Sequence, residues 1–441
     1  MTKKVLVIGN GGREHAICDA LARSPQKPEL YNLGNAVNPG IKNLNAHIQI
    51  GNPSDPQEVC AYAESIEADF VIIGPEDPLA KGVVDALQTK NIPVFGPTQQ
   101  CAQLESSKGF MRSLLKKYKI DASPAFVVFE NQNEQGMRQF FETFDGQIVV
   151  KADGLIGGKG VLVAGDHFET LEEAIKFAQS SIEKFGRVVF EEKLLGEEFS
   201  FITIVDGETV LPCPVIQDHK RAFEDDTGPN TGGMGCVSDE HGSLPFLAPH
   251  HLQQAQDITE RTMKALASEL NEKYVGVMYG GFIATREGVK LIEYNARFGD
   301  PEALNILPLL RTDFVEVCEK AIKGKLSEIS TLSFEPVATV VKYLCPEGYP
   351  TNPVKNVPLE RYTMGENVFF ASIAEENGSL ILKGSRAVGI LGKGKNITEA
   401  NNACEELIQQ FSGPIFYRQD IGTKTLIEKR VKHMKEIEDS I

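Results

Sequence analysis

The first indication of the fold is an apolar run that ends in a glycine cluster, Val5-Leu6-Val7-Ile8-Gly9-Asn10-Gly11-Gly12-Arg13-Glu14-His15. Four consecutive apolar residues predict a short buried strand, and the glycines after them predict a tight turn. The residues that follow, His15–Arg23, have the pattern of a helix. A strand, a turn and a helix in this order are typical of an α/β fold with a parallel sheet.

The same alternation continues to about residue 100. We expect strands at 46–50, 69–73 and 92–95, and helices at 55–68 and 79–90. Asp55 is the expected N-cap of the first of these helices, with Pro56 at its first position. Ligands of such sheets bind beyond the carboxyl ends of the strands. Those ends are predicted at residues 9–14, 34–38, 74–77 and 96–98.

The glycine cluster after the first strand favours a phosphate site, because a helix N-terminus donates free backbone N–H groups to an anion. A dinucleotide-binding fingerprint would need a third glycine where Glu14 stands. The next strand also ends without an acidic residue for a ribose, in Leu33-Gly34-Asn35. A nicotinamide-dependent dehydrogenase is therefore disfavoured. A simple strand-to-helix turn remains the alternative.

A second glycine-rich loop, Gly154-Leu155-Ile156-Gly157-Gly158-Lys159-Gly160, lies between two expected strands at 147–151 and 161–164. It departs from the Walker P-loop at both ends, because Asp153 replaces the first glycine and Gly160 replaces Ser or Thr. A flap over phosphates and a plain hairpin tip are equally good interpretations of the loop alone. Lys151 ends the preceding strand, from which it would reach a phosphate below such a flap.

The stretch Glu293-Tyr294-Asn295-Ala296-Arg297 carries the most specific chemistry. Alternate residues of a strand share a face, so Glu293, Asn295 and Arg297 are expected side by side. Carboxylate and amide oxygens suit Mg²⁺ that bridges nucleotide phosphates, and an arginine stabilises a phosphoryl group in transfer. An ordinary exposed strand edge would explain the charged residues but not their apolar neighbours.

The composition limits the possible partners. The 441 residues carry 45 Lys and Arg against 61 Asp and Glu, a net charge of −16, so we expect no nucleic-acid partner. No apolar run reaches the ~18 residues of a membrane span, and no membrane partner is expected. The eight cysteines are scattered without a CxxC pair. They predict reduced thiols and a cytoplasmic location.

The rest of the sequence predicts both helices and strands. Helices are expected at 107–119, 171–184, 252–270, 312–323 and 398–411, and strands at 187–192, 198–205, 279–285, 289–295, 338–343 and 386–391. Residues 217–235 have no clear period and are expected to be irregular. The length alone suggests about three domains.

The order of strand lysine, glycine loop, acidic strand and Glu-x-Asn-x-Arg resembles the ATP-grasp superfamily, whose members activate a carboxylate as an acyl phosphate. Further stretches resemble the phosphoribosylamine–glycine ligase family within it: residues 5–15, 74–76, 81–84, 96–98, 104–108, 151–154, 217–221, 226–235 and 297–302. The most specific string is Thr227-Gly228-Pro229-Asn230-Thr231-Gly232-Gly233-Met234-Gly235. The resemblance extends from residue 3 to about residue 430.

The resemblance implies an N-terminal parallel-sheet (Rossmann-like) domain at 1–105, a central ATP-grasp α+β region at 106–325 and a small mixed α+β domain at 326–441. A flap subdomain is expected at about 120–192 and a larger catalytic part at about 193–325. It also implies the reaction: ATP, glycine and 5-phosphoribosylamine become glycinamide ribonucleotide, ADP and phosphate, an early step of purine synthesis. Mg²⁺ or Mn²⁺ is the implied metal, the partners are these small molecules, and a monomer is expected.

The resemblance assigns roles residue by residue. The implied catalytic residues are Arg297 and Lys151, and the metal ligands are Glu293 and Asn295. The implied ATP-binding residues are Lys108, Lys151, Gly157, Gly158, Lys159, Gly160, Glu191, Leu194 and Glu198, with Glu191 and Leu194 near adenine and Glu198 near the ribose. The implied substrate-binding residues are Gly11, Gly12, Arg13, Glu14 and Glu76 for phosphoribosylamine, and Asp218, Asp300 and Glu302 around glycine.

Two stretches depart from the family pattern. The usual Pro-Gly-Asn-Ala-Gly turn reads Leu33-Gly34-Asn35-Ala36-Val37, and a small glycine-containing run near the C-terminus is replaced by Tyr343-Leu344-Cys345-Pro346-Glu347. The second change is expected to reshape a domain contact without touching the chemistry. The alternative function is another purine-pathway ATP-grasp ligase or carboxylase. A third possibility, a catalytically dead nucleotide-binding module, is disfavoured because the charged residues of the implied site are all present.

Overall fold

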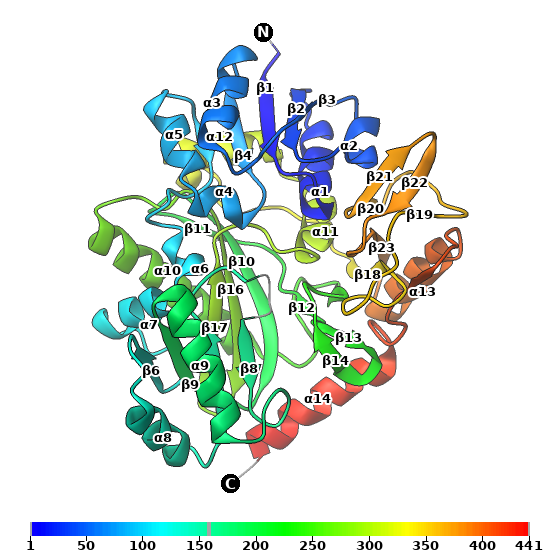
Figure 1. Cartoon of the computed structure of the whole chain (residues 1–441). Coiled ribbons are helices and arrows are strands. Elements are labelled where there is room, and N and C mark those ends of the chain that lie inside the picture. Colours follow the sequence, from blue (N-terminus) through cyan, green and yellow to red (C-terminus); the bar gives the residue numbers. More distant parts are fainter. Residues whose placement is uncertain (1, 157–159, 440–441) are drawn as a thin grey trace.

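The computed structural model describes residues 2–156 and 160–439, and it has the mixed α/β fold that the sequence predicts (Figure 1). The N-terminal part contains a five-stranded parallel sheet in the order β3-β2-β1-β4-β5. Its strands are β1 (Lys4–Ile8), β2 (Glu29–Gly34), β3 (His47–Ile50), β4 (Phe70–Ile73) and β5 (Val94–Phe95). The buried run from Val5 to Ile8 forms the central strand.

Of the connecting helices of this sheet, α3 begins where its sequence signals predict, whereas α1 and α4 begin three residues earlier than expected. Asp55 caps α3 by accepting hydrogen bonds from the backbone N–H groups of Gln57 and Glu58. The expected single helix at 79–90 is wrong, because Gly82 adopts a left-handed conformation (φ 76°) that separates two helices. The helices of this part are α1 (Gly12–Ala22), α2 (Pro39–Asn43), α3 (Pro56–Ser65), α4 (Glu76–Ala80) and α5 (Val83–Thr89).

The central part contains two antiparallel sheets. The smaller has the order β6-β9-β7-β8, and its own apolar core is packed under α8 (Glu134–Thr143) and α9 (Leu171–Phe185). Its strands are β6 (Phe126–Phe129), β7 (Ile148–Ala152), β8 (Val161–Val163) and β9 (Val188–Glu192). The glycine-rich loop joins β7 to β8, which are paired as a hairpin.

The larger central sheet has the order β11-β10-β16-β17. Its strands are β10 (Glu197–Val205), β11 (Val210–Pro212), β16 (Gly276–Thr285) and β17 (Gly288–Asn295). Helix α10 (Pro249–Leu270) packs against β16 and β17 and also contacts α7 (Lys108–Lys117). Two short helices, α6 (Gln103–Ser106) and α11 (Glu302–Ile306), lie at the ends of this sheet nearest the N-terminal part (Figure 1).

A third sheet combines strands from both sides of residue 326. Its order is β12-β15-β18-β23-β20, and β24 (Ile415–Phe416) also pairs with β18. The expectation of an irregular stretch at 217–235 is wrong in part, because β12 pairs with β15 and a hairpin of β13 and β14 lies between them. The strands are β12 (Gln217–Asp218), β13 (Arg221–Phe223), β14 (Thr227–Asn230), β15 (Gly235–Ser238), β18 (Ala338–Pro346), β20 (Val368–Phe370) and β23 (Val388–Gly394).

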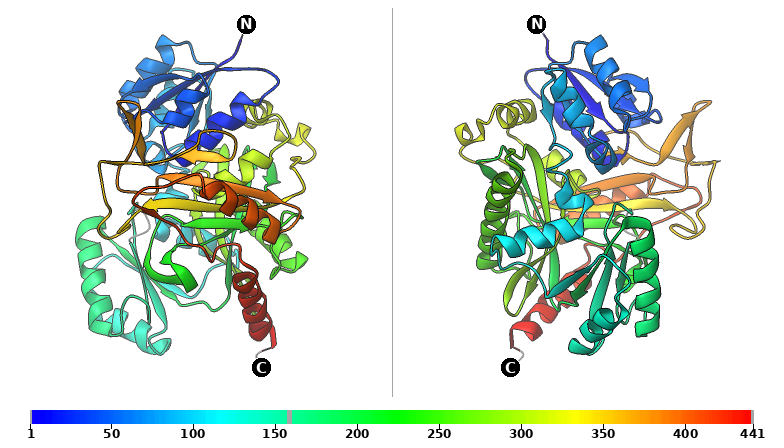
Figure 2. Two further views of the ribbon diagram at one scale, coloured as in Figure 1. Left: turned by 90° about the vertical axis from the view of Figure 1, so that its right-hand side faces the viewer. Right: turned by 60° about the vertical axis from the view of Figure 1, so that its left-hand side comes forward.

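The C-terminal part is completed by α13 (Ile397–Ile408) and by a small sheet of β19 (Val357–Pro358), β22 (Ser379–Leu382) and β21 (Ile373–Glu376). Helix α12 (Phe314–Ile322) packs back against β5 of the N-terminal sheet. The last helix, α14 (Lys424–Asp439), runs from the C-terminal sheet to the central strands β10 and β16 (Figure 2). There His433 and Arg430 are paired with the buried Glu197.

All eight cysteines are buried and unpaired. In residues 2–156 and 160–439, no group of three or more His, Cys, Asp or Glu side chains is placed to hold a metal ion. A search of the same residues finds no helix with the length and apolar character needed to span a bilayer.

Candidate active site

The face of β17 brings together the three polar residues that the sequence predicts. Glu293, Asn295 and Arg297 are half-buried, whereas Tyr294 and Ala296 between them are buried on the opposite face. The strand is bulged where Leu291 and Glu293 pair with successive residues of β16. Glu293, Asn295 and Arg297 therefore share one face, and their oxygen and guanidinium groups point away from the apolar core.

The carboxylate of Glu293 faces a cluster of cations. Lys220 Nζ lies 3.8 Å from Glu293 Oε1 and 3.9 Å from Glu198 Oε2. Burial alone would raise the pKa of Glu293, but the charges of Lys220, Lys151 and Lys108 hold it below its usual range. Burial would likewise lower the pKa of Lys220, yet the charges of Glu293 and Glu198 raise it. Glu293 and Lys220 are therefore charged at neutral pH. We call Glu293, Lys220 and Glu198 the open cluster.

Lys151 and Glu191 lie beside the open cluster in a different arrangement. Glu191 accepts two hydrogen bonds from Arg112, at 2.7 and 2.9 Å, and its Oε2 lies 2.7 Å from Lys151 Nζ. Burial would raise the pKa of Glu191, but Arg112 and Lys151 lower it to about 2. All three side chains are almost fully buried. We call Arg112, Glu191 and Lys151 the closed cluster.

The first end of the glycine-rich loop is anchored at the start of α7. Asp153 accepts hydrogen bonds from the backbone N–H of Gly109 and from the hydroxyl of Ser107, and it is paired with Arg187. Lys108 Nζ donates to the carbonyl oxygen of Gly154 at 3.2 Å. The predicted ATP-binding residues Gly157, Gly158 and Lys159 lie outside the described residues, whereas Gly160 is buried beside Ile156. Leu194 is half-buried in the connection from β9 to β10.

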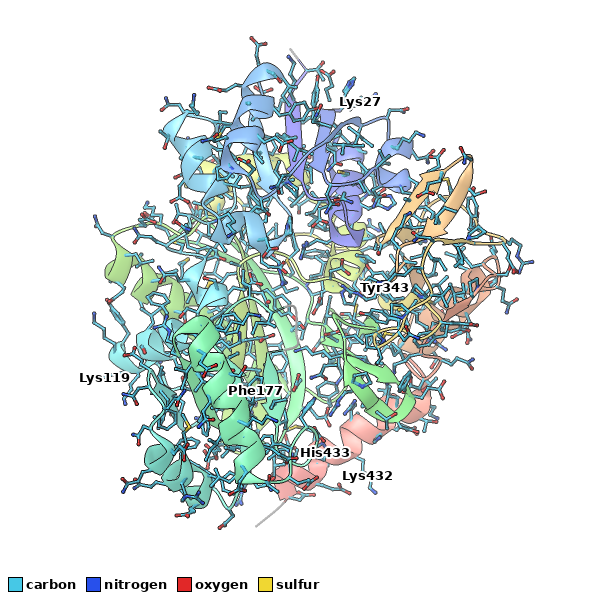
Figure 3. All side chains as sticks on the ribbon, viewed as in Figure 1. Lys27, Lys119, Phe177, Tyr343, Lys432 and His433 are labelled. Atoms are coloured by element: carbon cyan, nitrogen blue, oxygen red, sulfur yellow. The ribbon has the colours of Figure 1, made fainter. Side chains whose placement is uncertain are left out.

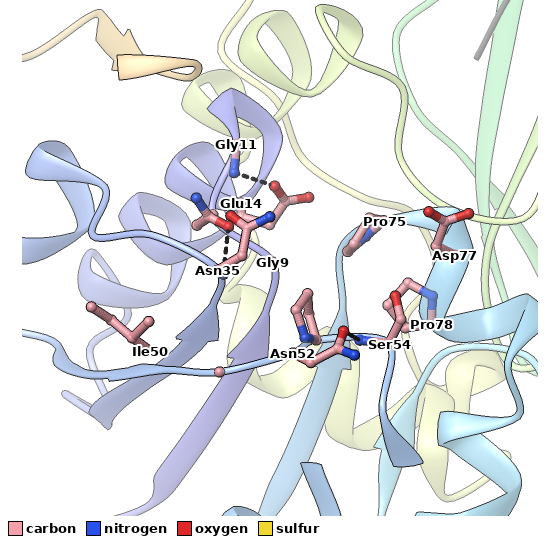
Figure 4. Close-up of a pocket in the computed structure, with 13 residues that line it drawn as sticks. Gly9, Gly11, Glu14, Asn35, Ile50, Asn52, Ser54, Pro75, Asp77 and Pro78 are labelled. Atoms are coloured by element: carbon pink, nitrogen blue, oxygen red, sulfur yellow. Dashed lines mark hydrogen bonds between the residues drawn. The ribbon is translucent and has the colours of Figure 1, made fainter. Parts of the chain in front are cut away.

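A cavity of about 660 Å³ opens at the carboxyl ends of the parallel strands (Figure 4). This is where the alternation of strands and helices predicts a ligand site. Glu14 and Gly11 line it as expected, and Glu14 Oε2 accepts a hydrogen bond from the backbone N–H of Gly11 at 2.6 Å. Asn35 and Asp77 line it from two of the predicted strand ends, whereas the sequence missed Asn52 and Ser54.

A chain of ion pairs connects this cavity to β17. Arg13 Nε lies 2.6 Å from Glu14 Oε1, and Arg13 Nη1 lies 3.9 Å from Glu76 Oε2. Arg297 Nε donates to Glu76 at 3.1 Å, and Arg297 Nη2 lies 2.8 Å from Glu105 Oε1. The charge of Arg297 lowers the pKa of Glu76 to about 2. The predicted substrate residues Arg13, Glu14 and Glu76 are therefore contiguous with the predicted catalytic arginine.

The turn after β17 contacts both the N-terminal part and the C-terminal part of the molecule. Asp300 accepts hydrogen bonds from Tyr343 at 2.7 Å and from the backbone N–H of Arg13 at 3.3 Å. Arg386 lies 3.3 Å from the same carboxylate, over the ring of Tyr343. Tyr343 also packs against Gly12, where a Cβ atom would stand 2.3 Å from its hydroxyl. The altered stretch at 343–347 therefore contacts Gly12 and Asp300, two of the predicted substrate residues, through Tyr343. Figure 3 labels Tyr343 among the side chains of the whole molecule.

Asp218 and Glu302 are the other two predicted substrate residues near this turn. Glu302 is buried and accepts hydrogen bonds from Tyr279 at 2.5 Å and from Ser200 at 3.2 Å. Burial and the neighbouring charge of Glu302 raise the pKa of Asp218 well above its usual range. Among the described residues, Asp218 Oδ1 is buried without a hydrogen-bond partner. Such an orphaned acceptor is costly unless a ligand or water supplies a donor.

Carboxylate and amide oxygens on one face of β17, a glycine-rich hairpin loop and a cavity at a parallel sheet together fit an enzyme of the ATP-grasp class. Three family models match the chain: the N domain of phosphoribosylglycinamide synthetase at residues 3–105, its ATP-grasp (A) domain at 106–303 and its C domain at 339–424. The chain is 43% identical to the phosphoribosylamine–glycine ligase of Methanocella arvoryzae, over 98% of this chain and 99% of that protein.

Solved structures agree with this relationship. The crystal structure of phosphoribosylamine–glycine ligase from Thermotoga maritima matches with a TM-score of 0.80 and 29% identity, covering 95% of this chain and 99% of that one. A biotin carboxylase of Campylobacter jejuni, at 15% identity and a TM-score of 0.71, covers 99% of this chain and 95% of that one and shares the fold. The chain belongs to the phosphoribosylamine–glycine ligase family, and it is an ATP-dependent ligase of purine synthesis.

Proposed function

We propose that the enzyme joins glycine to 5-phosphoribosylamine through a glycyl phosphate intermediate. The observation that carries this proposal is the position of Arg297, between the β17 oxygens of Glu293 and Asn295 and the ion pairs that lead to the N-terminal cavity. A phosphoryl-transfer site and a site for a second substrate are thereby adjacent. Such contiguity suits two consecutive reactions that share one reactive intermediate.

A divalent metal ion fits the oxygens of β17. Glu293 is ionised, and within the described residues its carboxylate is bound only by the long ion pair to Lys220. The amide of Asn295 has no hydrogen-bond partner in the same set. Mg²⁺ or Mn²⁺ bound here would offset the negative charge of the ATP phosphates. We assign Glu293 and Asn295 as its ligands.

The central part would bind ATP between its two sheets. We propose that Glu191 and Leu194 border the adenine, with Glu198 at the ribose, and that the loop from Gly154 to Gly160 covers the phosphates. Lys108 and Lys151 reach the same region from α7 and β7. Closure of the loop would keep water from the acyl phosphate.

In the first reaction a carboxylate oxygen of glycine attacks the γ-phosphorus of ATP, and the bond from that phosphorus to ADP breaks. Arg297 and Lys151 stabilise the charge of the transferring group. Asp218, whose Oδ1 lacks a partner among the described residues, together with Asp300 and Glu302, would receive the ammonium group of glycine. We propose this turn as the glycine site.

In the second reaction the amine nitrogen of phosphoribosylamine attacks the acyl carbon, and the bond from carbon to the phosphate oxygen breaks. The proton released by the amine leaves with the phosphate. We propose that phosphoribosylamine occupies the N-terminal cavity, held by the glycine turn at Gly11 and Gly12 and by the side chains of Arg13, Glu14 and Glu76. Of these residues, Gly11 and Glu14 line the cavity itself.

The proposed parts of the chain are a substrate domain at 1–105, an ATP-grasp region at 106–325 and a C-terminal domain at 326–441. The unpaired cysteines agree with the reducing cytoplasm in which we place the enzyme as a monomer.

Heavy-oxygen labelling tests the intermediate. Glycine labelled with ¹⁸O in both carboxylate oxygens should give inorganic phosphate that carries one labelled oxygen per turnover. Activation by adenylylation would instead place the label in AMP with release of pyrophosphate. Mass spectrometry of the released phosphate, with each substrate omitted in turn as a control, separates these outcomes. Unlabelled phosphate under tightly coupled turnover contradicts the proposal.

A further inference from the structure

Glu105 is a buried carboxylate whose position no step of the proposed reaction has so far used. It lies on α6, a short helix at the junction of the N-terminal and central parts that packs against both α4 and β17. Its side chain is 8% exposed. One oxygen accepts a hydrogen bond from the backbone N–H of Ala296 at 2.8 Å, and the other lies 2.8 Å from Arg297 Nη2.

The contacts of Glu105 fix both the backbone at the end of β17 and the guanidinium group of Arg297. The hydrogen bond to Ala296 holds the backbone where β17 ends, and the ion pair holds the guanidinium of the next residue. The other donors of Arg297 are also directed, because Nε donates to Glu76 at 3.1 Å and Nη1 to the carbonyl oxygen of Phe298 at 3.4 Å. A planar guanidinium held along two edges has one orientation, so its remaining N–H groups point in fixed directions.

Burial makes this contact a strong constraint. Arg297 is 15% exposed and Glu76 is 31% exposed, so Glu105 is the most enclosed of the three side chains. Burial, together with the charge of Glu76, raises the pKa of Glu105 above its usual range, although the charge of Arg297 and the Ala296 N–H act in the opposite direction. Of the two carboxylates at Arg297, only Glu105 also binds the backbone of β17.

We propose that Glu105 is a positioning residue for phosphoryl transfer, which aims Arg297 at the reacting phosphate by clamping its guanidinium and the end of β17 together. This inference rests on the proposed role of Arg297. Glu105 does not line the N-terminal cavity, and its two oxygens are bound by Ala296 and Arg297, so it acts through the arginine. A misplacement of about 1 Å in such a group lowers rates by up to roughly 100-fold without loss of binding.

The variant Glu105→Gln tests the clamp with little change of volume. The Gln carbonyl can accept from Ala296, but its NH₂ group then faces the N–H groups of Arg297, and two donors cannot bond. We expect kcat to fall about 10- to 100-fold while the KM for ATP changes less than about twofold. Glu105→Asp keeps the charge and should restore part of the lost kcat.

A double-mutant cycle separates positioning from stability. In Arg297→Met there is no guanidinium to aim, so adding Glu105→Gln should lower kcat no further. If Glu105→Gln lowers kcat by the same factor in both backgrounds, or leaves the wild-type kcat unchanged, the positioning role is wrong. A normal rate for Arg297→Met alone would instead contradict the proposed role of the arginine.

Glu405→Gln is the matched control. Glu405 is paired with the buried Lys342 and accepts from Tyr417 in the C-terminal part, away from both proposed substrate sites. Loss of the Glu405 charge in this variant should lower the melting temperature and leave kcat unchanged. The melting temperatures of all variants are measured alongside kcat. Should Glu405→Gln lower kcat as much as Glu105→Gln does, the effect at Glu105 would be one of stability and the inference would fail.

Discussion

The closed and open clusters both contact β17, but they differ in burial and in the lengths of their ion pairs. In the closed cluster, Arg112 is fully buried, makes two short contacts to Glu191 and donates to the carbonyl oxygens of Leu291 and Ile292. In the open cluster, the ion pairs of Lys220 exceed 3.7 Å and its side chain is 39% exposed. Short contacts among almost fully buried charges characterise a cluster whose side chains are held in place by the fold. Long contacts around ionised oxygens characterise one that awaits a ligand.

The largest expected effect comes from breaking the closed cluster. Arg112→Met leaves the carboxylate of Glu191 buried with Lys151 as its one remaining cation. The free energy of unfolding should fall by about 3–5 kcal/mol. Urea denaturation measures this, and Lys220→Met, which removes a cation from the open cluster, should change it by about 1 kcal/mol or less. Equal losses would show that the two clusters do not differ as described.

A smaller effect, on rate, is expected from the open cluster. Glu293→Gln removes one charged metal ligand, so the rate of glycine-dependent ADP release should fall roughly 100-fold, with the melting temperature nearly unchanged. Glu287→Gln makes the same chemical change at the exposed turn of the same hairpin and serves as the control. Wild-type turnover in Glu293→Gln at saturating ATP would remove this carboxylate from the metal site.

The smallest expected effect is a pH dependence. The pKa of Glu191 is lowered from 4.5 to about 2 in the folded protein, against the effect of burial, by Arg112 and Lys151. Between pH 2 and pH 4.5, the carboxyl group of Glu191 binds more protons in the unfolded chain than in the folded protein. The contribution of Glu191 to stability is therefore complete above pH 4.5 and is lost as the pH falls toward 2. In Glu191→Gln, the melting temperature should fall less steeply with acid over this window. Parallel curves for the two proteins would contradict the assignment.

The sequence predicts best where a pattern is local. The spacing of Glu293, Asn295 and Arg297 on one strand requires only the two-residue period of a β-strand. The N-cap of Asp55 likewise depends on its next few residues. Apolar spacing alone predicts one helix where the structure has α4 and α5, because the left-handed conformation of Gly82 is not apparent from that spacing.

Contacts between distant residues could not be predicted. Glu105 and Ala296 are 191 positions apart, and nothing in the string around Glu105 indicates that its partner is a strand end. Strand β12 has two residues, which is too short to show a period, and its pairing depends on β15 in another part of the chain. Asn52 and Ser54 reach the cavity only because β3 is the outer strand of the sheet.

The third sheet, whose strands come from both sides of residue 326, also affects the order in which the protein can fold during synthesis on the ribosome. Strand β15 ends at Ser238, but the strand that covers it, β18, ends at Pro346. Roughly a hundred residues must be translated in between, which takes on the order of 5–20 s. During that interval the nascent chain carries β15 without the neighbour it has in the finished sheet, and such an edge readily pairs with another chain. The growing polypeptide is therefore most exposed to misassembly before its last quarter has emerged.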